Sequence, residues 1–193
     1  MARPSRKAEV LQAAIELFSR QGYHATSVRD IARAVGMSKA GLYSSFSSKE
    51  AVLEEIYYSI IDDMLARVGE IAGAESAPAE KLRDAIVWQV MGTVERIPEM
   101  TIYYRERHHL SPEAAGRIAE KRRQYEAILE SIISDGIDVE AFRPVDVKVT
   151  AFGIAGMCAW TYRWYQEGGR LSARQVGELY ADLTLHGLAP TTP

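Results

Sequence analysis

Cysteine and long apolar runs are scarce in this chain of 193 residues. Cys158 is the only cysteine, which excludes an intramolecular disulfide and fits the reducing cytoplasm. The longest apolar stretch, about 14 residues between Lys148 and Arg163, is too short to cross a bilayer and predicts a buried helix. The first residues carry no apolar segment of the secretory type. These absences favour a cytoplasmic protein.

Motifs for nucleotide binding and for catalysis are also missing. The chain has no P-loop, dinucleotide fingerprint, H-E-x-x-H pair or G-x-S-x-G elbow. Glu106, His108 and His109 are the residues that could suggest an acid/base or metal site. Neighbouring residues on a helix point about 100° apart, so adjacent histidines are not expected to chelate one ion. We therefore expect no enzyme activity, no cofactor and no metal site.

Apolar residues recur at helical spacing, and no stretch of any length alternates as a strand does. This pattern predicts an all-α fold of about nine helices, separated by glycine, proline and capping residues. Ser47 with Glu50 predicts a capping box that opens a long helix, and Gly136 is expected to stop a later one. Outside residues 26–49, the predicted helices with defined bounds cover 5–21, 79–96, 98–107, 111–134, 146–166 and 172–187.

Residues 26–49 carry the most information, because they predict two short helices joined by a tight turn. Ser27 is placed to cap the first helix, with Asp30 three residues later completing a short capping box. Gly36 stands where a left-handed turn residue is needed, and Ser38 is placed to cap the second helix. This is the pattern of a helix-turn-helix, so DNA binding is the leading hypothesis.

The exposed side of the second helix suits a groove of DNA. Its outward positions are small or hydroxyl residues apart from Lys39 and Tyr43, so the helix can approach closely and donate to phosphates or base edges. Residues 1–50 have a net charge of +4, whereas the rest of the chain has −7. A basic head on an acidic body fits a phosphate-binding module joined to a part that avoids DNA. Arg3, Arg6 and Lys7 are open to two interpretations, a basic arm along the phosphates or a non-binding tail.

The ordered motifs of residues 8–57 resemble the TetR family of bacterial transcriptional regulators. The pattern includes Gly22-Tyr23, the segment Thr26–Ala32, and the segment from Val35 to Leu53 with its Leu42-Tyr43 pair. The resemblance implies a homodimeric repressor with a DNA-binding head over 1–50 and a ligand-binding and dimerisation body over 51–193. Ala40-Gly41 differs from many members, so no operator sequence is transferred. The DNA contacts expected at matching positions and on the exposed helix faces are Ser27, Arg29, Ser38, Lys39, Ala40, Tyr43, Ser44 and Lys49.

Residues 104–112 and 156–165 are similar to regulators of fatty-acid and steroid-ring catabolism that respond to acyl-CoA thioesters. That resemblance implies an apolar cavity with arginines near its mouth. Two alternatives stay open. One is a sensor of hydrophobic drug cations, and the other is a DNA-binding protein without a ligand that is controlled by a protein partner. The residues expected to line the effector site are Trp88, Met91, Tyr103, Tyr104, Arg105, Arg107, His108, Tyr125, Met157, Trp160 and Arg163.

The predicted helix 146–166 is apolar on more than one face, which is typical of a helix buried on several sides. We expect one face to pack in its own subunit and another against a partner, with the last helix completing a four-helix seam. Two recognition helices in such a dimer would enter successive major grooves of a palindromic operator. The expected interface residues are Phe152, Gly153, Gly156, Trp164, Val176, Leu179, Tyr180 and Leu183.

Overall fold

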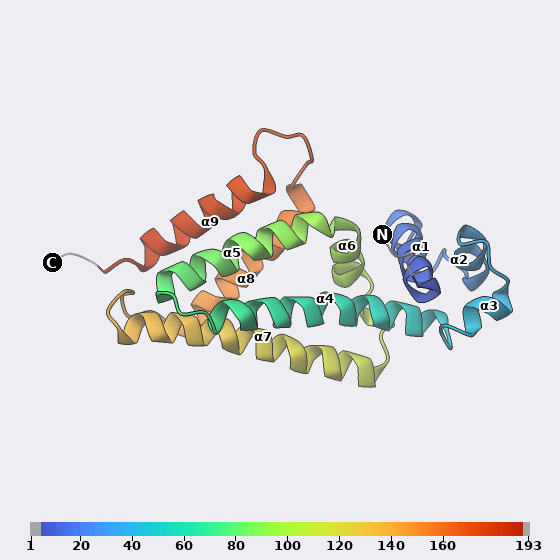
Figure 1. Ribbon diagram of the computed structural model, residues 1–193, viewed down its shortest axis with the longest axis horizontal. Helices are drawn as coiled ribbons and strands as arrows, with labels where there is room; N and C mark the ends of the chain where they lie inside the picture. Colours follow the sequence, from blue (N-terminus) through green and yellow to red (C-terminus); the bar gives the residue numbers. More distant parts are fainter. Residues whose placement is uncertain (1–4, 191–193) are drawn as a thin grey trace. The chain divides into compact units, whose positions relative to one another are not determined.

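The computed structural model describes residues 5–190, which form nine α-helices and one short 3₁₀ helix without a strand (Figure 1). The predicted all-α fold is confirmed. None of these helices is both long and apolar enough to cross a membrane. In chain order the helices are α1 (Arg6–Gln21), α2 (Val28–Ala34), α3 (Lys39–Tyr43), α4 (Lys49–Ala72), α5 (Pro78–Glu95), α6 (Ile97–Arg105), η1 (Arg107–His109), α7 (Pro112–Asp138), α8 (Val147–Trp164) and α9 (Ala173–Leu188).

The chain divides into two compact units. The head unit is the chain up to Ile61 together with Pro98–Ala119, and the body unit is Asp62–Ile97 together with the chain from Glu120 onward. The head unit thus contains α6 and η1 besides the N-terminal helices, although these lie beyond the boundary predicted at residue 50. Two hydrogen bonds explain the association, because the Tyr57 hydroxyl donates to the carbonyls of Ile102 at 3.1 Å and Tyr103 at 2.8 Å.

The head unit has its own apolar core. Phe18, Ile31, Leu42 and Leu53 come from α1 to α4 and are almost fully buried. Tyr23, in the turn after α1, is also buried and meets the Phe18 ring edge-on with 5.1 Å between the ring centroids. Tyr23 therefore belongs to the apolar core of the head unit.

In the body unit, α5 packs against both α8 and α9 (Figure 1). Leu82, Ile86 and Cys158 belong to its buried core, and burial raises the pKa of the Cys158 thiol to about 12. α9 lies close to α5 at Gly177, where an added Cβ would lie 2.9 Å from the Cα of Val87. A glycine is needed at that position because any side chain would push the two backbones apart.

Two helix boundaries differ from their predictions. α7 passes through Gly136 and ends at Asp138, so the expectation that this glycine stops the helix is wrong. The Phe142 ring occupies the space that a Cβ on Gly136 would take, at 2.1 Å, and Glu140 has the left-handed φ of 57° in the following turn. At the start of α4, Ser48 rather than Ser47 accepts a hydrogen bond, from the Ala51 amide at 3.1 Å.

Candidate nucleic-acid interface

The start of α2 is held by a reciprocal capping box, as predicted. The Ser27 hydroxyl accepts from the Asp30 amide at 3.2 Å, while the Asp30 carboxylate accepts from the Ser27 amide at 3.0 Å and from its hydroxyl at 2.6 Å. These hydrogen bonds from Ser27 hold the pKa of Asp30 below its usual range, with a smaller contribution from the nearby charges of Arg33 and Arg29. The capping fixes where α2 begins and leaves Arg29 on its exposed side.

The turn between α2 and α3 has the geometry expected of a helix-turn-helix. Gly36 has a φ of 66°, and the Met37 amide donates to the Ala32 carbonyl at 2.8 Å. The Ser38 hydroxyl then accepts from the Gly41 amide at 3.0 Å and begins α3. Because α3 is only five residues long, it depends on this cap and on the buried Leu42 for its position.

The outward face of α3 presents polar and small groups to solvent. Lys39, Ala40, Tyr43 and Ser44 are exposed, and the Lys39 ammonium lies 5.7 Å from the centroid of the Tyr43 ring. The Ser44 hydroxyl donates to the Gly41 carbonyl at 2.7 Å, which leaves its oxygen free to accept from a further donor. This face combines one cation, two hydroxyl side chains and a small residue, which allows both phosphate contact and close approach to base edges.

A second cation on α2 was missed by the sequence analysis. The Arg33 side chain is 74% exposed and has only a long contact to Asp30, with 3.7 Å between the nitrogen and the oxygen. Arg33 follows Arg29 by four residues, so the two lie one above the other on the surface of α2. That spacing was the available signal. Both residues are exposed to solvent.

Lys49 takes part in the internal structure of the head unit. Its ammonium donates to the carbonyls of Tyr23 at 2.9 Å and Thr26 at 3.0 Å, and lies 4.0 Å from the centroid of the Tyr23 ring. The Tyr23 hydroxyl donates to the Glu50 carboxylate at 3.1 Å. Lys49 therefore stabilises the turn between α1 and α2 through these two hydrogen bonds. The expected contact of Lys49 with a phosphate stays a prediction.

Arg6 and Lys7 lie in helix α1 and not in an extended arm or tail. Arg6 pairs with Glu9 of the same helix at 3.0 Å, and Lys7 pairs with Glu55 of α4 at 2.6 Å. Arg3 lies outside the described residues. Contact of these cations with phosphates stays a prediction.

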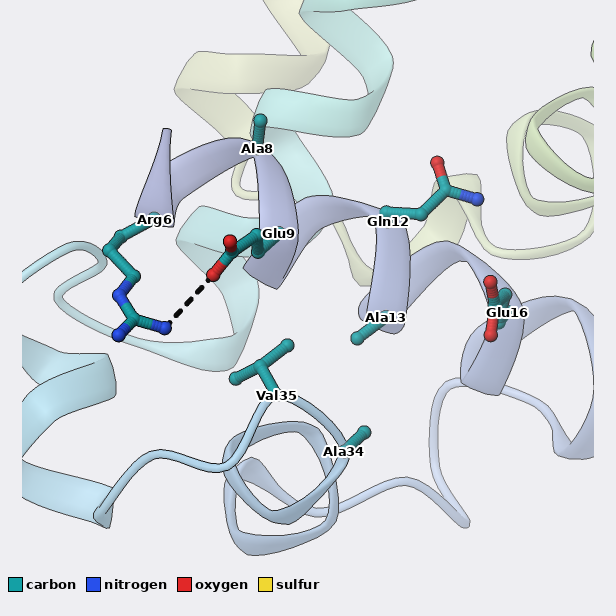
Figure 2. A pocket seen from close by; sticks show the side chains of 8 residues that line it. All are labelled: Arg6, Ala8, Glu9, Gln12, Ala13, Glu16, Ala34 and Val35. Carbon is teal, nitrogen blue, oxygen red and sulfur yellow. Dashed lines mark hydrogen bonds and ion pairs between the residues drawn. The ribbon is translucent and has the colours of Figure 1, made fainter. Parts of the chain in front are cut away.

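An open groove of about 670 Å³ lies between α1 and α2 (Figure 2). Its walls carry Arg6, paired with Glu9, together with Gln12 and Glu16 of α1, and Val35 from the end of α2. Two carboxylates against one already paired guanidinium make this groove unsuited to phosphate. None of the residues predicted to bind the effector lines it.

The residues predicted for the effector site divide between the two units. Tyr103, Tyr104, Arg105, Arg107 and His108 belong to the head unit, and the last four of these are exposed. The Tyr103 ring stacks on that of Tyr57 with 4.9 Å between centroids, so it contributes to packing within the head unit. The remaining members belong to the body unit: Trp88, Met91, Tyr125, Met157, Trp160 and Arg163.

Within the body unit, four polar side chains are buried: Gln89, Thr93, Tyr125 and Thr161. The Tyr125 hydroxyl donates to the Gln89 side-chain oxygen at 2.6 Å, and the Gln89 nitrogen donates to the Ala155 carbonyl at 3.4 Å. The Thr161 hydroxyl has no hydrogen-bond partner among the described residues. Sequence analysis missed Gln89, Thr93 and Thr161. The available signal was their placement among the apolar positions of two core helices.

Trp88, Met91 and Met157 are partly buried, and the first two pack against the apolar core of the body unit. Trp160 is 60% exposed, and the exposed Arg163 guanidinium lies 5.9 Å from its ring centroid. The structure thus places Trp160 and Arg163 on the exposed side of α8, and their expected contact with an effector stays a prediction. The reason for their exposure is helical spacing, since both follow the exposed side that also carries Phe152 and Trp164.

Apolar side chains remain exposed along α8 and α9. Phe152 and Trp164 are 45% exposed, while Leu179 and Leu183 are 54% and 66% exposed. Gly153 and Gly156 are also exposed, and an added Cβ on either would meet nothing within 4 Å. Large apolar side chains exposed on two helices of a folded domain are typical of an interaction surface.

Two members of the predicted dimer interface contact the core of their own subunit. Val176 is 3% exposed and belongs to the core of its own subunit, so its assignment to the interface is corrected. Tyr180 is partly buried and packs against the same core. Both lie on the side of α9 that faces α5, which single-helix periodicity did not separate from the outward side.

Family models match both parts of the chain. Residues 10–56 match the bacterial regulatory proteins of the tetR family, and residues 75–188 match the tetracyclin repressor-like C-terminal domain. The chain belongs to the TetR family. Members of this family are transcriptional regulators, so the protein is a DNA-binding transcriptional repressor and not an enzyme.

Known TetR regulators resemble the chain over nearly its whole length. It is 34% identical to the HTH-type transcriptional repressor KstR2 of Mycolicibacterium smegmatis, over 95% of this chain and 91% of that protein. The structure of the ketosteroid transcriptional regulator KstR2 of Mycobacterium tuberculosis matches with a TM-score of 0.89 and 30% identity, over 98% of each chain. AibR in complex with isovaleryl coenzyme A and operator DNA matches with a TM-score of 0.82 and 30% identity, over 97% of this chain and 100% of that one.

Proposed function

We propose that this TetR-family repressor acts as a homodimer that leaves a palindromic operator when a small hydrophobic effector binds, and that the effector is an acyl-CoA thioester from lipid or steroid catabolism. The observation that carries the proposal is the likeness over the whole chain to AibR, whose structure holds isovaleryl coenzyme A and operator DNA. The likeness to a ketosteroid regulator supports a catabolic effector.

The DNA side of the proposal rests on the exposed face of α3 and the cations of α2. Lys39 and Tyr43 extend from the recognition helix, while Arg29 and Arg33 flank it. Base contacts would come from Ala40 and Ser44, and phosphate contacts from the cations. In a twofold dimer the two recognition helices would lie about 34–36 Å apart, which matches successive major grooves on one side of the duplex.

The dimer side rests on the exposed apolar residues of α8 and α9. An isologous pairing of these helices would cover Phe152, Trp164, Leu179 and Leu183 and would use Gly153 and Gly156 for close helix approach. Trp160 and Arg163 lie on the same exposed side of α8, and we assign them to this interface or its rim.

The effector side rests on the buried polar side chains of the body unit. An unpartnered hydroxyl in an apolar interior costs about 1–3 kcal/mol, so the Thr161 hydroxyl favours binding of a ligand with polar atoms. Gln89 and Tyr125 would bind the thioester end, and Trp88, Met91 and Met157 would contact the acyl chain.

Operator binding by the purified full chain tests the proposal directly. Fluorescence anisotropy on duplexes from its own promoter region would be measured with and without isovaleryl-CoA, a long-chain acyl-CoA and a steroid-ring CoA thioester. We expect at least one thioester to lower operator affinity about tenfold or more, and the corresponding free acid and free CoA to leave it unchanged. Release by hydrophobic cations, or no release by any thioester, would overturn the effector class.

A pair of glutamine variants locates the effector site. Gln89→Met removes the buried amide at nearly constant volume, whereas Gln124→Met changes an exposed glutamine of α7. We expect Gln89→Met to keep operator binding and to lose most of the response to the thioester, and Gln124→Met to behave as the parent. An unchanged response in Gln89→Met would remove the buried polar side chains from the effector site.

A further inference from the structure

Three of the four histidines of this chain gather in the head unit. His24 lies in the turn between α1 and α2, while His108 and His109 belong to η1. One ring nitrogen from each lies within 4.8 Å of the other two. The ring centroids of His108 and His109 are 3.9 Å apart, and those of His24 and His109 are 4.1 Å apart.

This arrangement corrects the expectation that neighbouring histidines diverge. That expectation assumed a regular α-helix, whereas His108 and His109 lie in a 3₁₀ helix. There the two rings are neighbours, and the angle between their planes is 50°. His24, far away in the sequence, supplies the third ring. Tertiary structure therefore brings together a set of donors that no spacing rule within one helix predicts.

The donor atoms of the cluster are available. The Nε2 atom of His109 is buried and has no hydrogen-bond partner among the described residues, since the Glu106 carboxylate at 3.5 Å is not aligned to bond with it. An imidazole nitrogen without a hydrogen-bond partner is free to bind a metal ion.

Charged groups of both signs lie around the cluster. Glu106 lies against His109, and Glu50 accepts from Tyr23, whose ring stacks on that of His109 with 4.8 Å between centroids. The nearby cations are Lys49, whose ammonium is directed to two backbone carbonyls, and Arg107, which precedes His108 in η1. Two carboxylates and two cations leave the local charge balanced, so the imidazole nitrogens carry the argument for a metal ion.

We propose that His24, His108 and His109 bind one Zn²⁺ ion and thereby join the turn before α2 to η1. Three imidazole nitrogens suit Zn²⁺, which takes tetrahedral sites at about 2.0–2.1 Å from each nitrogen. Small rotations of exposed side chains would bring the three nitrogens to that distance, and the fourth position would take water or the Glu106 carboxylate. The metal would stabilise the head unit by linking two segments that are distant in the sequence.

Metal titration of the untagged full chain tests this site without using DNA. Zn²⁺ binding would be followed by calorimetry, and Co²⁺ would serve as a spectroscopic probe of tetrahedral coordination. We expect one Zn²⁺ per chain, a visible tetrahedral Co²⁺ spectrum that Zn²⁺ abolishes, and a thermal unfolding temperature that rises with Zn²⁺ but not with Mg²⁺. No Zn²⁺ binding at about ten micromolar would overturn the proposal, whatever the operator measurements show.

Variants of the exposed histidines assign the ligands. His24→Gln and His108→Gln change exposed side chains, so the fold is retained, as circular dichroism can verify. Each is expected to weaken Zn²⁺ binding at least about tenfold. The matched control is His186→Gln, since the fourth histidine lies at the end of α9, with its Nδ1 2.7 Å from the Asp182 carbonyl. Zn²⁺ binding that His24→Gln leaves unchanged, or that His186→Gln abolishes, would also overturn the assignment.

Discussion

At the scale of single residues, the described helices depend on positions where one side chain or its absence decides the packing. Gly136 leaves room for the Phe142 ring, and Gly177 lets α9 approach the backbone of α5. Ser27 and Asp30 bond to one another at the start of α2. These roles come from local contacts, so single substitutions test them.

Gly136→Ala should destabilise the body unit. Its new Cβ would lie 2.1 Å from the Phe142 ring, and forcing that ring aside costs about 1–3 kcal/mol. Gly116→Ala is the matched control, since it lies in the same helix and a Cβ there would meet nothing within 4 Å. The free energy of unfolding of Gly116→Ala should rise by about 0.5–1 kcal/mol. Urea unfolding measures both, and equal effects of the two variants would contradict the packing role of Gly136.

Asp30 should make stability depend on pH in the acid range. Because Ser27 lowers the pKa of Asp30 in the folded state, this carboxylate contributes stability above its unfolded pKa and loses it as the pH falls through the folded pKa. The urea midpoint of Asp30→Asn should therefore be lower than that of the parent at neutral pH, and the difference should shrink below about pH 4. Asp138→Asn, an exposed acid at the end of α7, is the control. A difference independent of pH would refute this role.

At the scale of elements, the two lysines of the helix-turn-helix region have different surroundings. Lys39 extends from α3 into solvent beside Tyr43, whereas Lys49 at the start of α4 donates to carbonyls in the turns before α2. The family pattern contains both residues, and sequence analysis assigned both to DNA. The contacts distinguish the two lysines, because the Lys49 ammonium already donates to two backbone carbonyls and therefore stabilises the head unit.

Lys39→Met and Lys49→Met form a matched pair for this distinction. Lys39→Met should weaken operator binding and reduce the salt dependence by about one phosphate contact, with stability unchanged within about 0.5 kcal/mol. Lys49→Met should lower the free energy of unfolding by about 1–3 kcal/mol, because two carbonyls lose a charged donor. Anisotropy at several salt concentrations and urea unfolding provide both measurements. An unchanged free energy of unfolding in Lys49→Met would show that these two hydrogen bonds do not stabilise the head unit.

At the scale of the whole molecule, the exposed apolar residues of α8 and α9 suggest that the single chain is not the functional assembly. Trp160 and Leu183 are at least 60% exposed, which is unusual for large apolar side chains grouped on neighbouring helices. A second subunit would remove this area from water and would set the spacing of the two recognition helices.

Leu183→Glu should convert the dimer to a monomer. A carboxylate introduced into an apolar twofold interface appears twice and is desolvated without a partner, which costs several kcal/mol per dimer. Val139→Glu is the control, because Val139 is also a large apolar side chain, 63% exposed, but lies in the turn after α7 and not on α8 or α9. Light scattering measures the mass, and operator affinity should fall only for Leu183→Glu. A monomeric parent, or a dimeric Leu183→Glu, would exclude this interface.

The sequence by itself determined the all-α fold, the helix-turn-helix and the family, because these depend on local patterns. Helical periodicity, the Ser27 and Ser38 caps and the turn at Gly36 act within a few residues, and the structure confirms each of them. Only tertiary structure decided which side of α8 and α9 is exposed, since a helix with apolar residues all round does not show which side its own core covers. It also decided the positions of Lys49 and the three histidines, because their partners lie far away in the sequence and meet only when the head unit folds.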